Sequence, residues 1–171
     1  MPGMLIWMTT YYLETHDPAE LRPSTREGAS ALRIERQSPS GATNQRFYKA
    51  VGADWAWTDR LPWTYERWES YARQPGLDTY LGYVDGTEIG YFELDRQPSG
   101  NTELAYFGLL PSAIGRGLGA QLLVTAIDQA WRDGAQRVWV HTCTLDHPQA
   151  LANYRRRGMQ LYKQESCWKE L

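Results

Sequence analysis

Residues 109–120 read Leu-Leu-Pro-Ser-Ala-Ile-Gly-Arg-Gly-Leu-Gly-Ala and join an apolar run to a long amphipathic run. Glycines at positions 115, 117 and 119 remove side chains where another group must approach the backbone closely. The first amides of a helix have no partner within the helix, and the helix dipole places partial positive charge there. The stretch therefore predicts a strand-to-helix turn that can bind a pyrophosphate, although the same glycines could simply allow a tight turn.

Other phosphate-binding loops fit this stretch less well. A P-loop requires Lys followed by Ser or Thr after its last glycine, whereas this chain has Ala120 and Gln121 there. A dinucleotide fingerprint requires a doubly wound parallel sheet, whereas the preceding region has the pattern of an antiparallel meander. Its three expected strands cover residues 79–84, 88–94 and 102–110, and Asp85-Gly86 is a strong signal for a two-residue hairpin.

The region after the turn predicts a parallel crossover. Residues 115–132 carry apolar side chains on one helical face, and residues 137–142 have the composition of a buried strand. A short helix from Pro148 to Gly158 and a final strand over 159–169 follow. Towards the N-terminus we expect strands over 5–14 and 31–37, a helix over 44–51, and a helix capped by Thr64. This order predicts a mixed α/β fold.

Bulk composition excludes several functional classes. The 171 residues suit one domain, which we assign to 1–171. A net charge of −2 favours neither nucleic acid nor an anionic membrane, and no run of residues is apolar enough to span a bilayer. Cys143 and Cys167 lie in no metal-ligand spacing, so we expect two reduced, buried thiols and no metal site. Without a signal-peptide pattern, we expect a cytoplasmic protein.

Aromatic residues are unusually frequent. The chain has 8 Trp and 11 Tyr, and many of them lie between Trp55 and Tyr91. They could form core, but they could also form the walls of a pocket for a ligand with an apolar or ring-shaped body. The candidates for acceptor binding are Trp55, Trp57 and Trp63.

Three segments together resemble the GNAT superfamily of acetyl-CoA-dependent N-acetyltransferases: residues 109–123, 137–144 and 154–159. Gly117 and Gly119 fill the glycine positions of the family's helix-start motif, and Tyr154 with Gly158 matches its later aromatic-x-x-x-Gly motif. Met159 replaces the family's Phe after that glycine. The resemblance implies a mostly antiparallel sheet with splayed central strands and flanking helices.

The resemblance also implies how acetyl-CoA would bind as co-substrate. Leu109 and Leu110 would pair with the pantetheine through their backbones, and the pyrophosphate would lie on amides of Gly115, Arg116, Gly117, Leu118, Gly119 and Ala120. The family's leading Arg or Gln at the turn is replaced by Ile114, so Arg116 could supply the charge. The usual Asn at the start of the later helix is replaced by His147, another candidate coenzyme contact.

The implied reaction is direct attack of a neutral amine, on a small-molecule acceptor, at the thioester. Glu103 matches the catalytic base of some relatives, and His141 on the next strand is an alternative base. Tyr154 stands where many relatives keep the acid that protonates the thiolate. A non-catalytic acyl-CoA sensor and a transferase for a longer acyl chain stay open as alternatives. Family members often pair, so a homodimer is also open.

Overall fold

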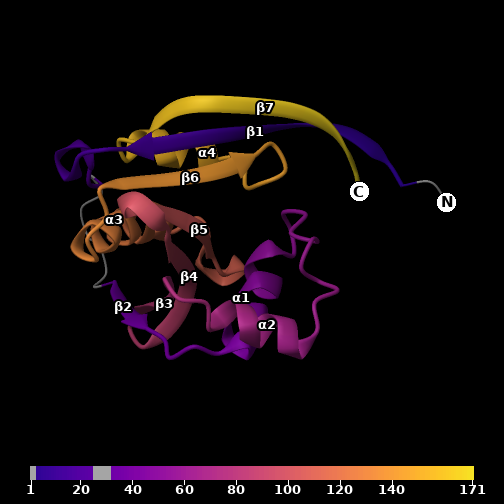
Figure 1. Cartoon of the computed structure of the whole chain (residues 1–171), viewed down its shortest axis with the longest axis horizontal. Coiled ribbons are helices and arrows are strands. Elements are labelled where there is room, and N and C mark those ends of the chain that lie inside the picture. The colour runs from indigo at the N-terminus through magenta and orange to yellow at the C-terminus, as the bar shows by residue number, and fades with distance from the viewer. Residues whose placement is uncertain (1–2, 25–31) are drawn as a thin grey trace.

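The computed structural model describes residues 3–24 and 32–171, and within them the strands form one sheet (Figure 1). The strand order is β2-β3-β4-β5-β6-β1-β7. In chain order the strands are β1 (Leu5–Thr15), β2 (Arg33–Arg36), β3 (Leu77–Val84), β4 (Thr87–Arg96), β5 (Asn101–Leu109), β6 (Arg137–Cys143) and β7 (Gln160–Glu170). The helices are α1 (Gly41–Gly52), α2 (Tyr65–Ala72), α3 (Leu118–Arg132) and α4 (Ala150–Arg156). The predicted mixed α/β fold is confirmed.

The hairpin between β3 and β4 has the predicted two-residue turn. Asp85 and Gly86 both adopt positive φ, at 51° and 76°. This left-handed backbone matches the twist of the flanking strands. The strands pair from Val84 with Thr87, the register shifts once between Tyr83 and Gly82, and β4 pairs antiparallel with β5. The expected antiparallel meander is therefore present.

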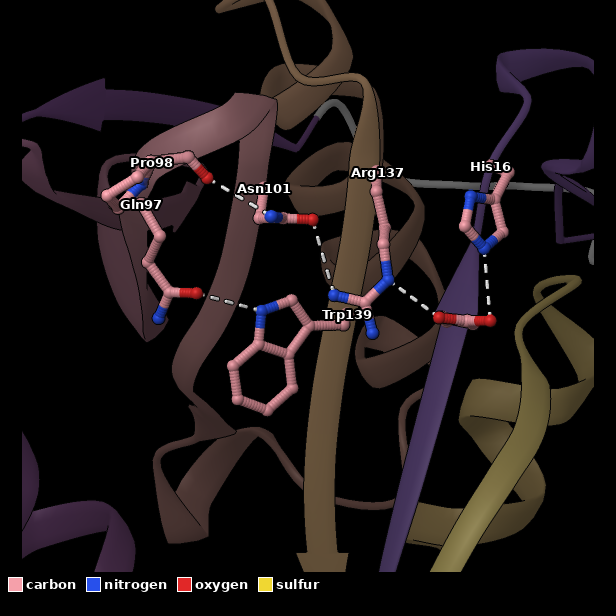
Figure 2. A network of polar contacts seen from close by, with 7 residues as sticks. His16, Gln97, Pro98, Asn101, Arg137 and Trp139 are labelled. Carbon is pink, nitrogen blue, oxygen red and sulfur yellow. Dashed lines mark hydrogen bonds and ion pairs between the residues drawn. The ribbon is translucent and has the colours of Figure 1, made fainter.

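The splay of the central strands is also present. β5 and β6 run parallel but pair only at residues 101–103 with 137–139, and beyond this point they separate. Side chains bind the paired end together (Figure 2): Arg137 donates to Asn101 at 3.4 Å, and Trp139 donates to Gln97 at 3.1 Å. Arg137 also donates to Glu14 of β1 at 2.6 Å. The gap therefore opens only at the carboxyl ends of the two strands.

A β-bulge changes which face of the sheet β5 presents. Glu93 lies opposite Tyr106 and Leu94 opposite Leu104, so Ala105 is an extra residue without a partner. Leu104 and Leu109 both pack into the core on the α3 face although they are an odd number of positions apart. Glu103 therefore lies on the opposite face from Leu109, although a regular strand would place two residues six positions apart on the same face.

The helices cover the sheet from two sides. On β4, the neighbours Tyr91 and Phe92 point to opposite faces. Tyr91 packs against Phe47 of α1, whereas Phe92 belongs to the larger core that includes Leu122 of α3. Tyr154 of α4 belongs to this same core. We refer to these two sides as the α1 face and the α3 face. No helix in the described ranges is long and apolar enough to cross a membrane.

Several predicted boundaries are wrong for local reasons. α3 begins at Leu118 rather than at position 115, because Gly115 and Gly117 adopt φ of +84° and +76°, outside helical geometry. α1 begins three residues early because Ser40 caps it, accepting a hydrogen bond from the amide of Thr43 at 3.4 Å. Thr64 caps α2 as expected. Position 31 of the expected strand over 31–37 lies outside the described residues.

Two further expectations need correction. α4 begins at Ala150 rather than at Pro148, because residues 147–149 form a turn in which the amide of Ala150 donates to the carbonyl of His147 at 2.9 Å. The later end is as expected, with Gly158 at φ +99°. Both cysteines are free, but neither is the buried thiol that we expected: Cys143 is half-buried and Cys167 is exposed. It lies on β7, the edge strand of the sheet, where side chains have no neighbouring strand.

Candidate active site

A pocket of about 510 Å³ lies where β5 and β6 separate. It is lined by β5, by the turn before α3, by β6 and the turn after it, by α4, and by residues 53–64. We call residues 53–64 the α1–α2 segment. Leu109 and Tyr154 reach the pocket from the α3 face, whereas Trp57 and Tyr106 reach it from the α1 face. The pocket therefore passes between the strands and is reached from both sides of the sheet.

The glycine turn contributes backbone rather than side chains. Gly115, Gly117, Gly119 and Ala120 line the pocket. Arg116 is exposed and lies outside the lining, and the side chain of Leu118 is buried in the core at 3% exposure. Neither side chain is therefore placed to bind a ligand here, although the amides at the start of α3 have no partner in the helix. A Cβ on Gly119 would lie 3.5 Å from Leu109, so the turn packs closely against β5.

Leu109 and Leu110 differ in what their backbones can bind. The amide of Leu110 donates to the carbonyl of Ile89 at 2.9 Å, and its carbonyl accepts from the amide of Ala113 at 2.9 Å. Both polar groups of Leu110 thus already have partners within the chain, and its amide is not free to pair with a ligand. Because amides alternate along a strand, that of Leu109 points away from β4 and into the gap.

The two candidate bases form one pair. His141 Nδ1 lies 3.3 Å from a carboxylate oxygen of Glu103, and the other oxygen accepts from Gln97 at 2.9 Å. The hydrogen bond to Glu103 raises the pKa of His141. His141 lines the pocket, whereas Glu103, on the same α1 face, lies behind the histidine and outside the lining. Glu103 therefore contacts the pocket-lining histidine but does not line the pocket itself.

Tyr154 lies at the other side of the gap. Its side chain is 6% exposed, lines the pocket and packs edge-on against Phe107 with ring centroids 6.3 Å apart. Burial, and then the negative charge of Asp146, raise the pKa of its phenol. The hydroxyl is therefore protonated at neutral pH and available as a hydrogen-bond donor.

Trp55 and Trp57 lie in the pocket wall, as expected for acceptor-binding residues. Trp57 contacts Tyr106 with centroids 5.1 Å apart, and Trp55 contacts His147 at 4.7 Å. Trp63 lies elsewhere, and its predicted place in the pocket is wrong. It packs against Trp68 at 5.0 Å and beneath the Arg60 guanidinium at 4.5 Å, which holds it in a separate aromatic layer.

Sequence reasoning missed the role of Asp146, which lies between β6 and α4. Its carboxylate accepts from Thr142 at 2.6 Å, the amide of Cys143 at 3.0 Å and the indole of Trp57 at 3.2 Å. It thus joins the turn after β6 to the α1–α2 segment. His147 uses Nδ1 to accept from the amide of Gln149 at 3.0 Å and lines the pocket. Trp57 is 89 positions from Asp146, so no local signal marks this contact.

Comparison with known proteins agrees with this geometry. The sequence model of the acetyltransferase (GNAT) family matches residues 44–159. No curated protein matches the sequence. Among solved structures, a GCN5-related N-acetyltransferase from Kribbella flavida is 22% identical with a TM-score of 0.64. The match covers 98% of this chain and 59% of that protein. A second GCN5-related N-acetyltransferase, from Sphaerobacter thermophilus, is 23% identical with a TM-score of 0.59. This match covers 99% of this chain and 52% of that protein.

A third similar structure is an aminoglycoside acetyltransferase from an uncultured soil metagenomic sample, in complex with trehalose. It is 15% identical with a TM-score of 0.59, and the match covers 72% of this chain and 85% of that protein. At these identities the structural likenesses show a common fold. This chain spans between half and two thirds of the length of the first two structures.

Proposed function

Because this chain belongs to the GNAT acetyltransferase family, we propose that it transfers the acetyl group of acetyl-CoA to an amine of a small molecule. The observation that carries the proposal is the gap between β5 and β6, which opens onto the glycine turn on one face and onto His141 on the other. A thioester and an amine that enter from opposite faces can meet in this gap.

The residues present fit a pyrophosphate-bearing co-substrate. The backbone of Gly115, Gly117, Gly119 and Ala120 lines the pocket at the start of α3, where unpaired amides and the helix dipole favour a diphosphate. Leu109 offers a free strand edge to the pantetheine amides, and its amide can donate to the oxyanion that develops on the carbonyl. Acetyl-CoA supplies the thioester that the amine attacks.

His141 is the base in this proposal, and Glu103 positions it. An alkyl ammonium has a pKa near ~10.4, so about one molecule in a thousand is neutral at pH 7 and a base must remove the proton. With Nδ1–H donating to Glu103, the histidine presents Nε2 as its basic nitrogen. Tyr154 then donates its phenolic proton to the departing thiolate. The ammonium thus loses two protons: the first goes to His141 and then to solvent, and the second, lost as the amide forms, balances the one that reaches the sulfur.

The proposal is tested by incubating the protein with acetyl-CoA and a panel of amines that includes phenylalkylamines, polyamines and sisomicin, and by following release of free thiol. Calorimetry with acetyl-CoA alone measures binding separately. Turnover with at least one amine is expected. Binding without any turnover would favour the acyl-CoA sensor, for which the replacement of the family's Arg or Gln by Ile114 is the supporting observation. Faster turnover with succinyl-CoA would favour the longer donor.

A further inference from the structure

Asp146 is a carboxylate in the wall of the pocket whose hydrogen-bond partners are all neutral. Its Oδ2 accepts from the Thr142 hydroxyl at 2.6 Å and from the amide of Cys143 at 3.0 Å. Its Oδ1 accepts only from the indole of Trp57 at 3.2 Å. A carboxylate has about four acceptor positions, so Oδ1 keeps one for a further donor.

None of the described ion pairs includes Asp146. Within residues 3–24 and 32–171, no Lys, Arg or His lies within ion-pair distance of Asp146. The other aspartate in the lining, Asp59, has Lys169 at 3.6 Å. The negative charge of Asp146 instead acts on the two groups proposed for proton transfer, because it raises the pKa of both His141 and Tyr154. A charge that is partly buried without a cationic partner favours binding of a cationic ligand.

The walls beside this carboxylate are aromatic. Trp57, which donates to Asp146, has Tyr106 at 5.1 Å and Tyr48 at 5.6 Å between ring centroids, and all three rings line the pocket. Aromatic faces attract cations and pack against other rings, and they offer few groups to a highly hydroxylated ligand. A carboxylate next to such faces matches an ammonium group attached to an apolar ring.

We propose, on the basis of the acetyltransferase function above, that Asp146 binds the ammonium form of the acceptor and that this acceptor is an arylalkylamine whose ring packs on Trp57. The ammonium would donate one N–H to Asp146 Oδ1 and give another proton to His141 before attack. Asp146 is thus a specificity-determining residue that selects cationic amines over neutral ones.

The test compares Asp146→Asn with the native chain on two amines of similar size, using thiol release from acetyl-CoA. The first probe, 2-phenylethylamine, is an ammonium at pH 7, whereas the second, 4-ethylaniline, is neutral. A hydrogen bond to a charged group corresponds to about 10- to 100-fold in affinity. We therefore expect Asp146→Asn to lower kcat/KM for 2-phenylethylamine by about 10- to 100-fold and to change that for 4-ethylaniline by less than about threefold.

Two matched variants separate charge from structure. Trp57→Phe removes the indole donor but keeps the carboxylate, so it should change kcat/KM for both probes by a similar factor. Asp146→Glu keeps the charge and should retain the preference for the ammonium. Equal losses on both probes in Asp146→Asn would mean that Asp146 only supports the turn, and this would overturn the inference. Melting temperature and acetyl-CoA affinity report whether each variant is folded.

The native chain provides a test that needs no variant. Raising the salt concentration should lower kcat/KM for 2-phenylethylamine but not for 4-ethylaniline, because salt screens only the charged encounter. The same flat response for both probes would overturn the inference even if Asp146→Asn does not fold. Absence of turnover with either probe, while acetyl-CoA binds, would overturn the acceptor class alone. Absence of acetyl-CoA binding would instead overturn the proposed function.

Discussion

Replacing the two members of the His141–Glu103 pair one at a time separates their roles. His141→Gln removes the proposed base, and general base catalysis is typically worth about 10²–10⁴ in rate. Glu103→Gln removes only a charge 3.3 Å behind the imidazole. The side chain of His141 is 48% exposed, so solvent screens this pair and its free energy is on the order of 1 kcal/mol. We therefore expect a loss of about fivefold for Glu103→Gln.

The pH dependence of kcat/KM also tests whether His141 is the base, because the direction in which the profile shifts can be predicted. The hydrogen bond to Glu103 raises the pKa of His141, and the base must be neutral to act. Activity should rise as the pH passes the pKa of His141, and in Glu103→Gln this acidic limb should move to lower pH. The assay is thiol release at subsaturating amine between about pH 5 and 9, with acetyl-CoA saturating.

The reverse order of the two effects would refute this reasoning. If Glu103 takes the proton itself through a water molecule, Glu103→Gln should lose about 10²–10⁴ in rate, and His141→Gln should lose much less. An acidic limb that stays in place in Glu103→Gln would also count against the pair. Acetyl-CoA affinity serves as the control, because neither side chain belongs to the glycine turn.

Tyr154→Phe should lower kcat by about 10²-fold or more while calorimetric acetyl-CoA affinity stays within about threefold, and unchanged kcat would remove the phenol from the mechanism. Trp57→Ala should raise KM for the amine, whereas Trp63→Ala should lower the melting temperature, since the first ring lines the pocket and the second packs on Trp68. The hydrogen bond from Arg46 lowers the pKa of Glu88, so Glu88→Gln should be less stable than the native chain at pH 7. This difference should vanish at low pH, where the native carboxyl is protonated. Urea unfolding at several pH values measures it.

Most of the proposed coenzyme-binding region could be predicted from short sequence motifs. Gly115 and Gly117 are needed because the turn before α3 has positive φ, and a sequence shows such a requirement directly. The alternation of apolar residues and the Asp85-Gly86 turn fixed the antiparallel meander. Tyr154 and Gly158 were placed because Tyr154 lies in one short helix and Gly158 lies in the turn that ends it.

The rest depended on contacts that have no local pattern. The bulge at Ala105 arises from the pairing of two strands, so the spacing in sequence does not show that Glu103 and Leu109 lie on opposite faces. Leu110 is engaged by Ile89, a residue 21 positions away on another strand. The contact between Asp146 and Trp57 joins segments that meet only once the sheet is formed. These three features depend on how distant segments pair and pack in the folded chain, and not on the local secondary-structure propensity of each segment.

Calorimetric binding of acetyl-CoA to Gly119→Glu and Gly119→Ala tests the central claim, that the start of α3 binds the diphosphate, most directly. A Cβ at position 119 would meet Leu109 at 3.5 Å, an ordinary contact, so both variants should fold. A glutamate there repels a diphosphate by on the order of 3 kcal/mol, or about 100-fold. We expect that loss for Gly119→Glu and a change of less than about tenfold for Gly119→Ala. Native affinity in Gly119→Glu would contradict it.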